Sequence, residues 1–328
     1  MPVQITIIGL GQIGASIGLA LAGQKENLLR VGHDKEFSIE RAALQKNAVD
    51  KAEHNLPRAV EDAGIVLLAL PIHQVRETLE FIAPDLKRGT VVVDTAPVKS
   101  EVAKWAKEIL PEGCYYIGLV PTIGAEFLQE TGTGLDSAKA DLFKNSIFLL
   151  DAPAGTPSDA LQLVADLVKL TGAAFIIADI LESDGLMAST YLLPQLVSAA
   201  LLNAIIDQPG WMEARKVAGK SFLAATSGFL VQDDPDALRI LSLQNKENVS
   251  RTIDRMIAAL VDLRDDIEDG NNESIKARLQ TAQKGRENWV SDGAAANWTE
   301  KKVEPLEHVS LKERILGTVI GKSTKDKK

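Results

Sequence analysis

The sequence lacks several features that would point to particular classes of protein. It has one cysteine, Cys114, among 328 residues, so no disulfide forms within the chain and a reducing compartment is expected. Lysine and arginine number 36 against 45 aspartates and glutamates, which gives a net charge of -9. Because nucleic-acid-binding proteins present a basic surface, this composition argues against a nucleic-acid partner and leaves a small-molecule substrate as the expectation.

A long uninterrupted apolar run is also missing. The most apolar stretch, residues 191–206, is broken by Pro194, Gln195, Ser198 and Asn203. We therefore expect a buried helix there rather than a membrane span. The first residues show no basic start followed by an apolar segment, as a secretory signal would. A cytoplasmic protein without a membrane partner is the resulting expectation.

Short β-branched runs alternate with amphipathic stretches over residues 1–178. Strands that are apolar throughout indicate burial on both faces of a parallel sheet, and their alternation with helices indicates a doubly wound α/β domain of the Rossmann type. The expected strands cover residues 3–8, 29–33, 65–70, 90–94, 115–120, 147–151 and 174–178, and the expected helices 15–22, 75–82, 101–109 and 158–170.

Strand patterns stop after about residue 180. Residues 179–310 indicate an all-helical domain for substrate binding and dimerisation, and residues 311–328 a polar tail. From Val249 to Ile267 apolar residues recur at steps of four and three, which is a heptad-like seam. The seam fits either a helix packed within one chain or a subunit interface. Together with the apolar stretch at 191–206, it predicts a homodimer through the helical domain.

The most informative motif is Gly9-Leu-Gly11-Gln12-Ile13-Gly14, placed between a predicted strand and a predicted helix. In this context Gly9 permits a tight turn, Gly11 lets the backbone approach a pyrophosphate, and Gly14 lets the helix pack on the strand. The backbone N–H groups at the start of the helix, around Gln12 and Ile13, would then face the phosphates. The motif predicts a dinucleotide site.

A carboxylate ends the second predicted strand, twenty residues after Gly14. Asp34 at this position would accept hydrogen bonds from the ribose hydroxyls of NAD and repel the 2′-phosphate of NADP. NAD is therefore the predicted cofactor and NADP the less favoured one. Ligands of open α/β sheets bind beyond the carboxyl ends of the strands. The residues expected to line the cofactor there are Leu70, Pro71, Asp94 and Pro97.

Further motifs follow in a characteristic order. They are Leu70-Pro71, Asp94-x-x-x-Val98-Lys99, Pro121-x-x-Gly124-x-Glu126, Leu193-Pro194 and Asn245-Lys246-Glu247-Asn248. With the glycine loop, this order resembles the prephenate/arogenate dehydrogenase family of tyrosine biosynthesis over roughly residues 3–270. The resemblance implies an NAD(P)-dependent oxidoreductase that performs an oxidative decarboxylation. A histidine of the family bonds the substrate hydroxyl, and an arginine binds a substrate carboxylate.

The sequence departs from the family pattern at these polar positions. The residues found there are Val120 for the catalytic histidine, Leu192 and Gln195 for two further histidines, Ser227 for the arginine and Pro97 for a loop serine. No histidine lies between His73 and His308, where the family's histidines fall. Loss of a general base lowers a rate by about 10²- to 10⁴-fold, so other residues must act if this chemistry persists.

Three residues are candidates for the catalytic role: His73 beyond a strand end, Thr122 beside Gly124, and Tyr191 on the apolar stretch. Each also has an ordinary structural explanation, as a loop residue or a core tyrosine. No metal site is predicted. Three functions stay open: a prephenate/arogenate dehydrogenase with altered residues, a dehydrogenase or imine-type reductase for a less anionic substrate, and a non-catalytic NAD-binding sensor or assembly protein.

Overall fold

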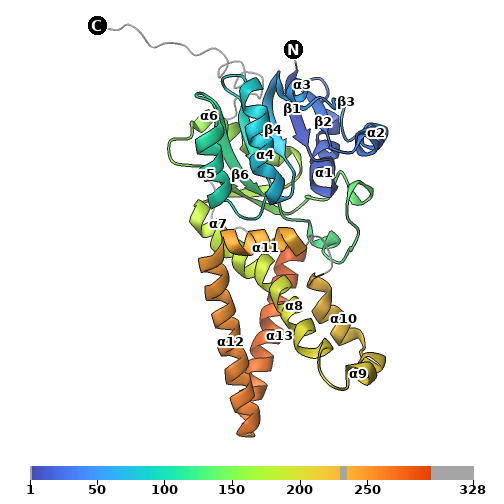
Figure 1. Cartoon of the computed structure of the whole chain (residues 1–328), viewed down its shortest axis with the longest axis vertical. Coiled ribbons are helices and arrows are strands. Elements are labelled where there is room, and N and C mark those ends of the chain that lie inside the picture. The colour runs from blue at the N-terminus through green and yellow to red at the C-terminus, as the bar shows by residue number, and fades with distance from the viewer. Residues whose placement is uncertain (1, 230–234, 297–328) are drawn as a thin grey trace, which may run out of the picture. The chain divides into compact units, whose positions relative to one another are not determined.

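The computed structural model describes residues 2–229 and 235–296, and these form two compact units. Unit 1 runs to Ile180, and unit 2 is Leu181–Ala295 (Figure 1). The polar tail expected at 311–328 lies outside the described residues.

Unit 1 is an eight-stranded sheet in the order β3-β2-β1-β4-β5-β6-β7-β8, flanked by helices (Figure 1). The predicted Rossmann-type fold is thus confirmed, since β1 to β6 follow the usual order of that fold. The elements are β1 (Val3–Ile8), α1 (Gln12–Ala20), β2 (Leu28–His33), α2 (Phe37–Gln45), β3 (Lys51–Ala52), α3 (Leu56–Val60), β4 (Ala63–Leu68), α4 (Ile72–Ile82), β5 (Val91–Asp94), α5 (Ser100–Ile109), β6 (Tyr115–Val120), β7 (Ile147–Asp151), α6 (Ser158–Leu170) and β8 (Ala174–Ala178).

One strand breaks the parallel arrangement that the sequence predicts. β7 pairs antiparallel with β6, with Gly118 opposite Asp151 and Val120 opposite Leu149. The connection between them, residues 121–146, contains only short 3₁₀ turns, at Ala125–Phe127 and Leu135–Ser137. To form a parallel pair, the connection must carry the chain back to the end of the sheet at which the first strand began, usually through a helix. Residues 121–146 form no such helix. The expectation of a wholly parallel sheet is therefore wrong at β7.

A buried ion pair ties the first helix to the second and third strands. Arg30 on β2 is 1% exposed, and its guanidinium bonds the Asp50 carboxylate through Nε at 2.9 Å and Nη2 at 2.6 Å. Its Nη1 donates to the carbonyl oxygens of Gly18 at 2.7 Å and Asn47 at 2.9 Å. Burial would raise the pKa of Asp50, but the hydrogen bonds and charge of Arg30 outweigh it and hold the pKa below its usual range.

Unit 2 is helical throughout its described residues, as predicted. Its long helices α12 and α13 pack side by side, and α10 packs on α8 (Figure 1). The elements are α7 (Ile180–Met187), the π-helical turn η5 (Ala188–Leu192), α8 (Leu193–Ile206), α9 (Trp211–Val217), α10 (Lys220–Thr226), α11 (Pro235–Gln244), α12 (Lys246–Glu268) and α13 (Asn272–Ala295).

The helical run Ile180–Ile206 is apolar and sparsely covered by its own chain. It is 27 residues long, and 11% of its most apolar window is buried. By length and composition alone it is sufficient to cross a membrane. Within α8 only Ser198 is buried. The burial predicted for residues 191–206 is therefore not supplied by one copy of the chain.

The heptad-like seam lies on α12 and is only partly covered. Val249 is buried and Ile253 and Met256 are half-buried, whereas Leu260 is 53% and Ile267 59% exposed. Packing within one chain accounts for the first part of the seam alone. The remainder is an apolar surface of the kind that subunit interfaces cover.

We predict that Asp50→Asn lowers the free energy of unfolding by about 3 kcal/mol, because it leaves the buried Arg30 guanidinium without its counter-charge. Urea unfolding at pH 7 measures this. Since the folded-state pKa of Asp50 is lowered, its stabilisation is present above about pH 4 and is lost as the pH falls further. The gap between variant and wild type should therefore shrink in acid.

The matched control is Asp62→Asn, which removes the exposed ion pair with Lys87. Exposed pairs contribute little to stability, so its unfolding midpoint should stay near that of the wild type. Equal losses in the two variants would contradict a structural role for the Arg30–Asp50 pair.

Candidate functional site

The glycine-rich loop joins β1 to α1, and its three glycines meet different surroundings. Gly9 has a φ of +93°, and a Cβ there would lie 2.3 Å from the carbonyl oxygen of Ala69. A Cβ on Gly14 would lie 2.1 Å from the carbonyl oxygen of Gly9. A Cβ on Gly11 would meet nothing within 4 Å. Gly9 and Gly14 are thus required by packing, whereas Gly11 borders open space.

The start of α1 beside Gly11 is available to an anion. No side chain caps the helix, and its first turn holds no acidic residue. The backbone N–H groups of this turn, which begins with Gln12 and Ile13, therefore keep their partial positive charge. Such a helix start binds phosphate groups. The open space at Gly11 lies where a pyrophosphate would approach.

Asp34 follows β2, and its carboxylate lies against the glycine loop. Its Oδ2 accepts a hydrogen bond from the backbone N–H of Leu10 at 2.9 Å, and its Oδ1 accepts one from the backbone N–H of Glu36 at 3.0 Å. Its own backbone N–H donates to Oε1 of Glu40 at 3.1 Å. These bonds hold the Asp34 carboxylate beside the glycine turn. Dinucleotide-binding folds place at this position the carboxylate that binds the cofactor's ribose.

Two further loops lie at the carboxyl ends of β4 and β5. A Cβ on Gly9 would lie 3.0 Å from Leu70 Cδ2, so the first of these loops neighbours the glycine turn. Pro71 precedes α4 and is exposed, and Pro97 is half-buried. These three residues have the predicted position, and cofactor contact by them stays a prediction.

Asp94 acts on its loop rather than on a ligand. The Asp94 and Lys99 side chains are completely buried, with Lys99 Nζ 2.5 Å and 2.9 Å from the two carboxylate oxygens. The Tyr116 hydroxyl donates to the same carboxylate at 3.4 Å. Because both ends of residues 94–99 are joined by this pair, the intervening loop is held in shape. The Asp94 side chain is thus enclosed in protein, and a direct cofactor contact through it is not supported by this geometry.

The three catalytic candidates have different surroundings. The Thr122 hydroxyl donates to the Ile147 carbonyl at 2.6 Å and accepts from the Ile147 N–H at 3.2 Å, so it joins two backbone segments. His73 lies exposed in the first turn of α4, with Nε2 3.2 Å from the Gln74 side-chain nitrogen. These two residues belong to unit 1. Tyr191 belongs to unit 2, where it is half-buried in the π-helical turn.

Four residues that the sequence predicts to replace polar groups of the family are buried or hydrogen-bonded within their own units. Val120 is 5% exposed at the end of β6, and Leu192 is fully buried. The Gln195 side chain donates to the Tyr191 carbonyl at 3.0 Å, and the Ser227 hydroxyl donates to the Ala224 carbonyl at 3.0 Å. None of these four side chains carries an acid–base or cationic group, and their equivalence to the family's polar positions stays a prediction.

Two hydrogen bonds at the start of α1 could hardly be predicted from the sequence. The buried Ser16 hydroxyl on α1 accepts from the backbone N–H of Lys139 at 3.0 Å, and the Gln12 side chain donates to the Ser137 carbonyl at 3.4 Å. Residues 137–139 therefore lie against the start of α1. The partners are 123 and 125 residues apart, and a small polar residue on the buried face of a helix is the only hint.

The glycine turn, the uncapped helix start and the strand-end carboxylate define unit 1 as a Rossmann-type nucleotide-binding unit. Comparison with known families agrees and goes further. The chain belongs to the prephenate dehydrogenase family, as the sequence predicts: residues 17–177 match "Prephenate dehydrogenase, nucleotide-binding domain" and residues 181–281 match "Prephenate dehydrogenase, dimerization domain".

Individual relatives agree with this family. Prephenate dehydrogenase of Bacillus subtilis is 25% identical over 86% of this chain and 75% of its own length. Cyclohexadienyl dehydrogenase of Zymomonas mobilis is 26% identical over 86% of this chain and 94% of its own. In fold, the chain is similar to prephenate dehydrogenase of A. aeolicus in complex with hydroxyphenyl propionate and NAD+, with a TM-score of 0.78, 21% identity and coverage of 88% and 98%.

We predict that Gly11→Ala leaves stability within about 1 kcal/mol of wild type, because alanine at this N-cap meets no neighbour, but abolishes nucleotide binding by filling the open space. Calorimetric titration with NAD+ measures binding, and urea unfolding measures stability. Gly14→Ala is the matched comparison: its Cβ collides with the Gly9 carbonyl, so it should destabilise the protein as well. Undiminished NAD+ binding by Gly11→Ala would contradict this placement of the phosphates.

Proposed function

We propose that this chain is an NAD-dependent oxidoreductase acting on a small substrate of the prephenate/arogenate type. The observation that carries the proposal is the Asp34 carboxylate, held on the glycine loop beside an uncapped helix start. A carboxylate at this position selects ribose hydroxyls over a 2′-phosphate. The family's relatives include dehydrogenases named for prephenate and cyclohexadienyl substrates, which supports the substrate class.

The chain's residues would divide the work as follows. The first turn of α1 and Gly11 bind the pyrophosphate, Asp34 binds the adenosine ribose, and Leu70 packs beside the glycine turn. NAD+ supplies the hydride acceptor when bound. The buried Asp94–Lys99 pair holds the neighbouring loop so that the site is preorganised before substrate arrives.

A general base is the group still required, since hydride loss from a hydroxyl-bearing carbon needs an acceptor for the hydroxyl proton. Val120 and Leu192 cannot accept a proton. The Thr122 hydroxyl already bonds both the carbonyl and the N–H of Ile147. His73, beyond the carboxyl end of β4 with an exposed imidazole, is the candidate of unit 1 that we propose for this role.

A second candidate function rests on the same replacements. Apolar Val120 and Leu192 and the internally bonded Ser227 are suited to a substrate with fewer carboxylates than prephenate. An NAD-dependent dehydrogenase or reductase for such a substrate is the alternative, and a non-catalytic NAD-binding protein is the third. Turnover of prephenate or arogenate separates the first function from these two.

We predict NADH formation, followed by absorbance, when purified protein is given NAD+ with prephenate or with arogenate. His73→Ala should then lower kcat/KM by at least about 100-fold while NAD+ affinity is unchanged, because a base is lost and the nucleotide site is not. Arg76→Ala, on an exposed position of the same helix, is the control. NAD+ binding without turnover of either compound would reject the first function and favour the other two.

We further propose a homodimer formed through unit 2. The support is the family's dimerization domain over residues 181–281, the uncovered run Ile180–Ile206 and the exposed end of the α12 seam. A second copy would cover these apolar surfaces, which gives protein rather than lipid as the partner of the long apolar helix.

Light scattering at micromolar concentration should therefore give the mass of a dimer. The double variant Leu260→Glu/Ile267→Glu should shift it toward the monomer, because charges placed in an apolar interface are costly to bury. Ser250→Glu, at an exposed polar position of α12, should leave the mass unchanged. A wild-type monomer would contradict the proposal.

A further inference from the structure

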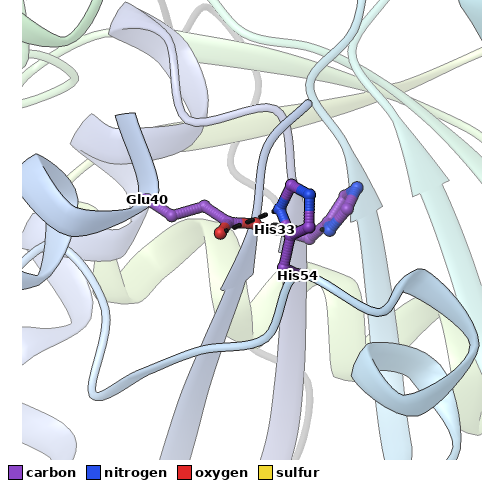
Figure 2. Close-up of side chains that lie close together, drawn as sticks. All are labelled: His33, Glu40 and His54. Carbon is purple, nitrogen blue, oxygen red and sulfur yellow. Dashed lines mark hydrogen bonds and ion pairs between the residues drawn. The ribbon is translucent and has the colours of Figure 1, made fainter. Parts of the chain in front are cut away.

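Three side chains from separate elements of unit 1 converge beside Asp34 (Figure 2). His33 ends β2, Glu40 lies on α2, and His54 follows β3. Figure 2 shows the Glu40 carboxylate reaching toward the two imidazole rings. Oε1 of Glu40 lies 3.4 Å from Nδ1 of His33, and Oε2 lies 3.1 Å from Nδ1 of His54. All three ligand atoms lie within 4.8 Å of one another.

Two of these separations, from the two Glu40 oxygens to the two imidazole nitrogens, are close to those between ligands of a tetrahedral metal ion. Zinc binds histidine nitrogen and carboxylate oxygen at about 2.0–2.2 Å, so two ligands of one ion lie roughly 3.3–3.5 Å apart. The two nitrogen–oxygen distances are close to this value, and small side-chain rotations would complete the set. Two histidines and one glutamate are a ligand set that catalytic zinc sites use, with water in the fourth position.

The surroundings of Glu40 also call for a cation. The Glu40 side chain is 2% exposed, and its carboxylate accepts a hydrogen bond from the backbone N–H of Asp34 and contacts the two imidazoles. Burial of a carboxylate without a counter-charge is costly. Among residues 2–229 and 235–296, the charged partners of Glu40 are the two histidines, and neither lysine nor arginine forms an ion pair with it. A neutral imidazole supplies no counter-charge. A divalent metal ion bound by all three groups would supply it.

We propose that His33, Glu40 and His54 bind a zinc ion. The two imidazoles favour a late first-row metal over calcium or magnesium, which prefer oxygen ligands throughout. The His54 side chain is 54% exposed and gives the ion a route in from solvent. Nδ1 of His33 also lies 3.1 Å from the Glu53 carbonyl oxygen, to which it can only donate, so zinc binding replaces this hydrogen bond and moves the ring hydrogen to Nε2.

The site adjoins the residue proposed to bind the NAD ribose. Glu40 Oε1 accepts the backbone N–H of Asp34, and His33 directly precedes Asp34. A bound zinc ion would hold the β2–α2 turn and with it the Asp34 carboxylate. We therefore expect zinc to tighten NAD+ binding by about fivefold or more, as coupling between adjacent sites commonly does. This expectation rests on the proposed function, whereas the metal site does not.

The test is calorimetric titration of the metal-free full chain with Zn²⁺ in the absence of nucleotide. One Zn²⁺ per chain is expected, with visible absorption typical of tetrahedral coordination when Co²⁺ replaces it. His54→Ala should weaken Zn²⁺ binding by more than about 100-fold, since loss of even an outer-shell partner costs 10- to 100-fold. His54 is exposed, so this variant should fold, which its thermal unfolding in the absence of metal checks.

His73→Ala is the matched control, because it removes an exposed histidine outside the cluster, and its Zn²⁺ affinity should equal that of wild type. Absence of stoichiometric binding, or equal affinity in His54→Ala and wild type, would overturn the metal site. Repeating the NAD+ titration with and without Zn²⁺ tests the coupling separately. Unchanged NAD+ affinity at saturating Zn²⁺ would overturn the coupling, and absent NAD+ binding with intact Zn²⁺ binding would overturn the proposed cofactor alone.

Discussion

The buried Arg30 guanidinium is the interaction on which the nucleotide-binding unit depends. It joins the Asp50 carboxylate after the second helix to the carbonyl of Gly18 on α1 and to that of Asn47 in the α2–β3 connection. These bonds set the direction of α1 relative to β2. Because α1 begins at the glycine turn and Asp34 directly follows β2, the Arg30–Asp50 pair helps to place the start of α1 and the Asp34 carboxylate relative to each other.

Close packing completes this arrangement. Gly14 and Gly18 leave no room for a Cβ, which would lie 2.1 Å from the Gly9 carbonyl and 2.2 Å from the Ala48 carbonyl. The helix therefore approaches the sheet and the α2–β3 connection at backbone distance. Gly11, by contrast, borders open space, so packing does not require its lack of a side chain. The proposed approach of a pyrophosphate would account for it.

The polar groups of unit 1 form two networks with different roles. Asp94, Lys99 and Tyr116 are enclosed and shape the loop after β5. Asp34, Glu40 and the two histidines reach toward the surface at the end of β2. The sequence predicts that Val120, Leu192, Gln195 and Ser227 replace the family's acid–base and cationic groups, and these side chains are apolar or bonded within their own unit. Which residues act on a substrate is therefore a question for experiment.

Much of this was accessible from the sequence because the signals are local. Alternating apolar runs predicted the strands, with β1, β6, β7 and β8 at the observed limits, and the glycine spacing predicted the turn and helix. The short β3 has no such run, and the reversal of β7 depends on the path of residues 121–146. The order of polar and apolar residues along the chain does not predict the path of residues 121–146.

The sequence by itself determined the Rossmann-type fold and the position of Asp34, since each follows from periodicity or spacing within a few tens of residues. It also indicated the family, through a resemblance in the order of motifs along the chain. Tertiary structure alone decided that the Asp94 side chain is enclosed by Lys99, that the Thr122 hydroxyl is engaged by Ile147, and that the apolar helix is left uncovered by its own chain. It also brought His33, Glu40 and His54 together. Such contacts depend on which distant elements become neighbours, and that is settled by packing of the whole sheet.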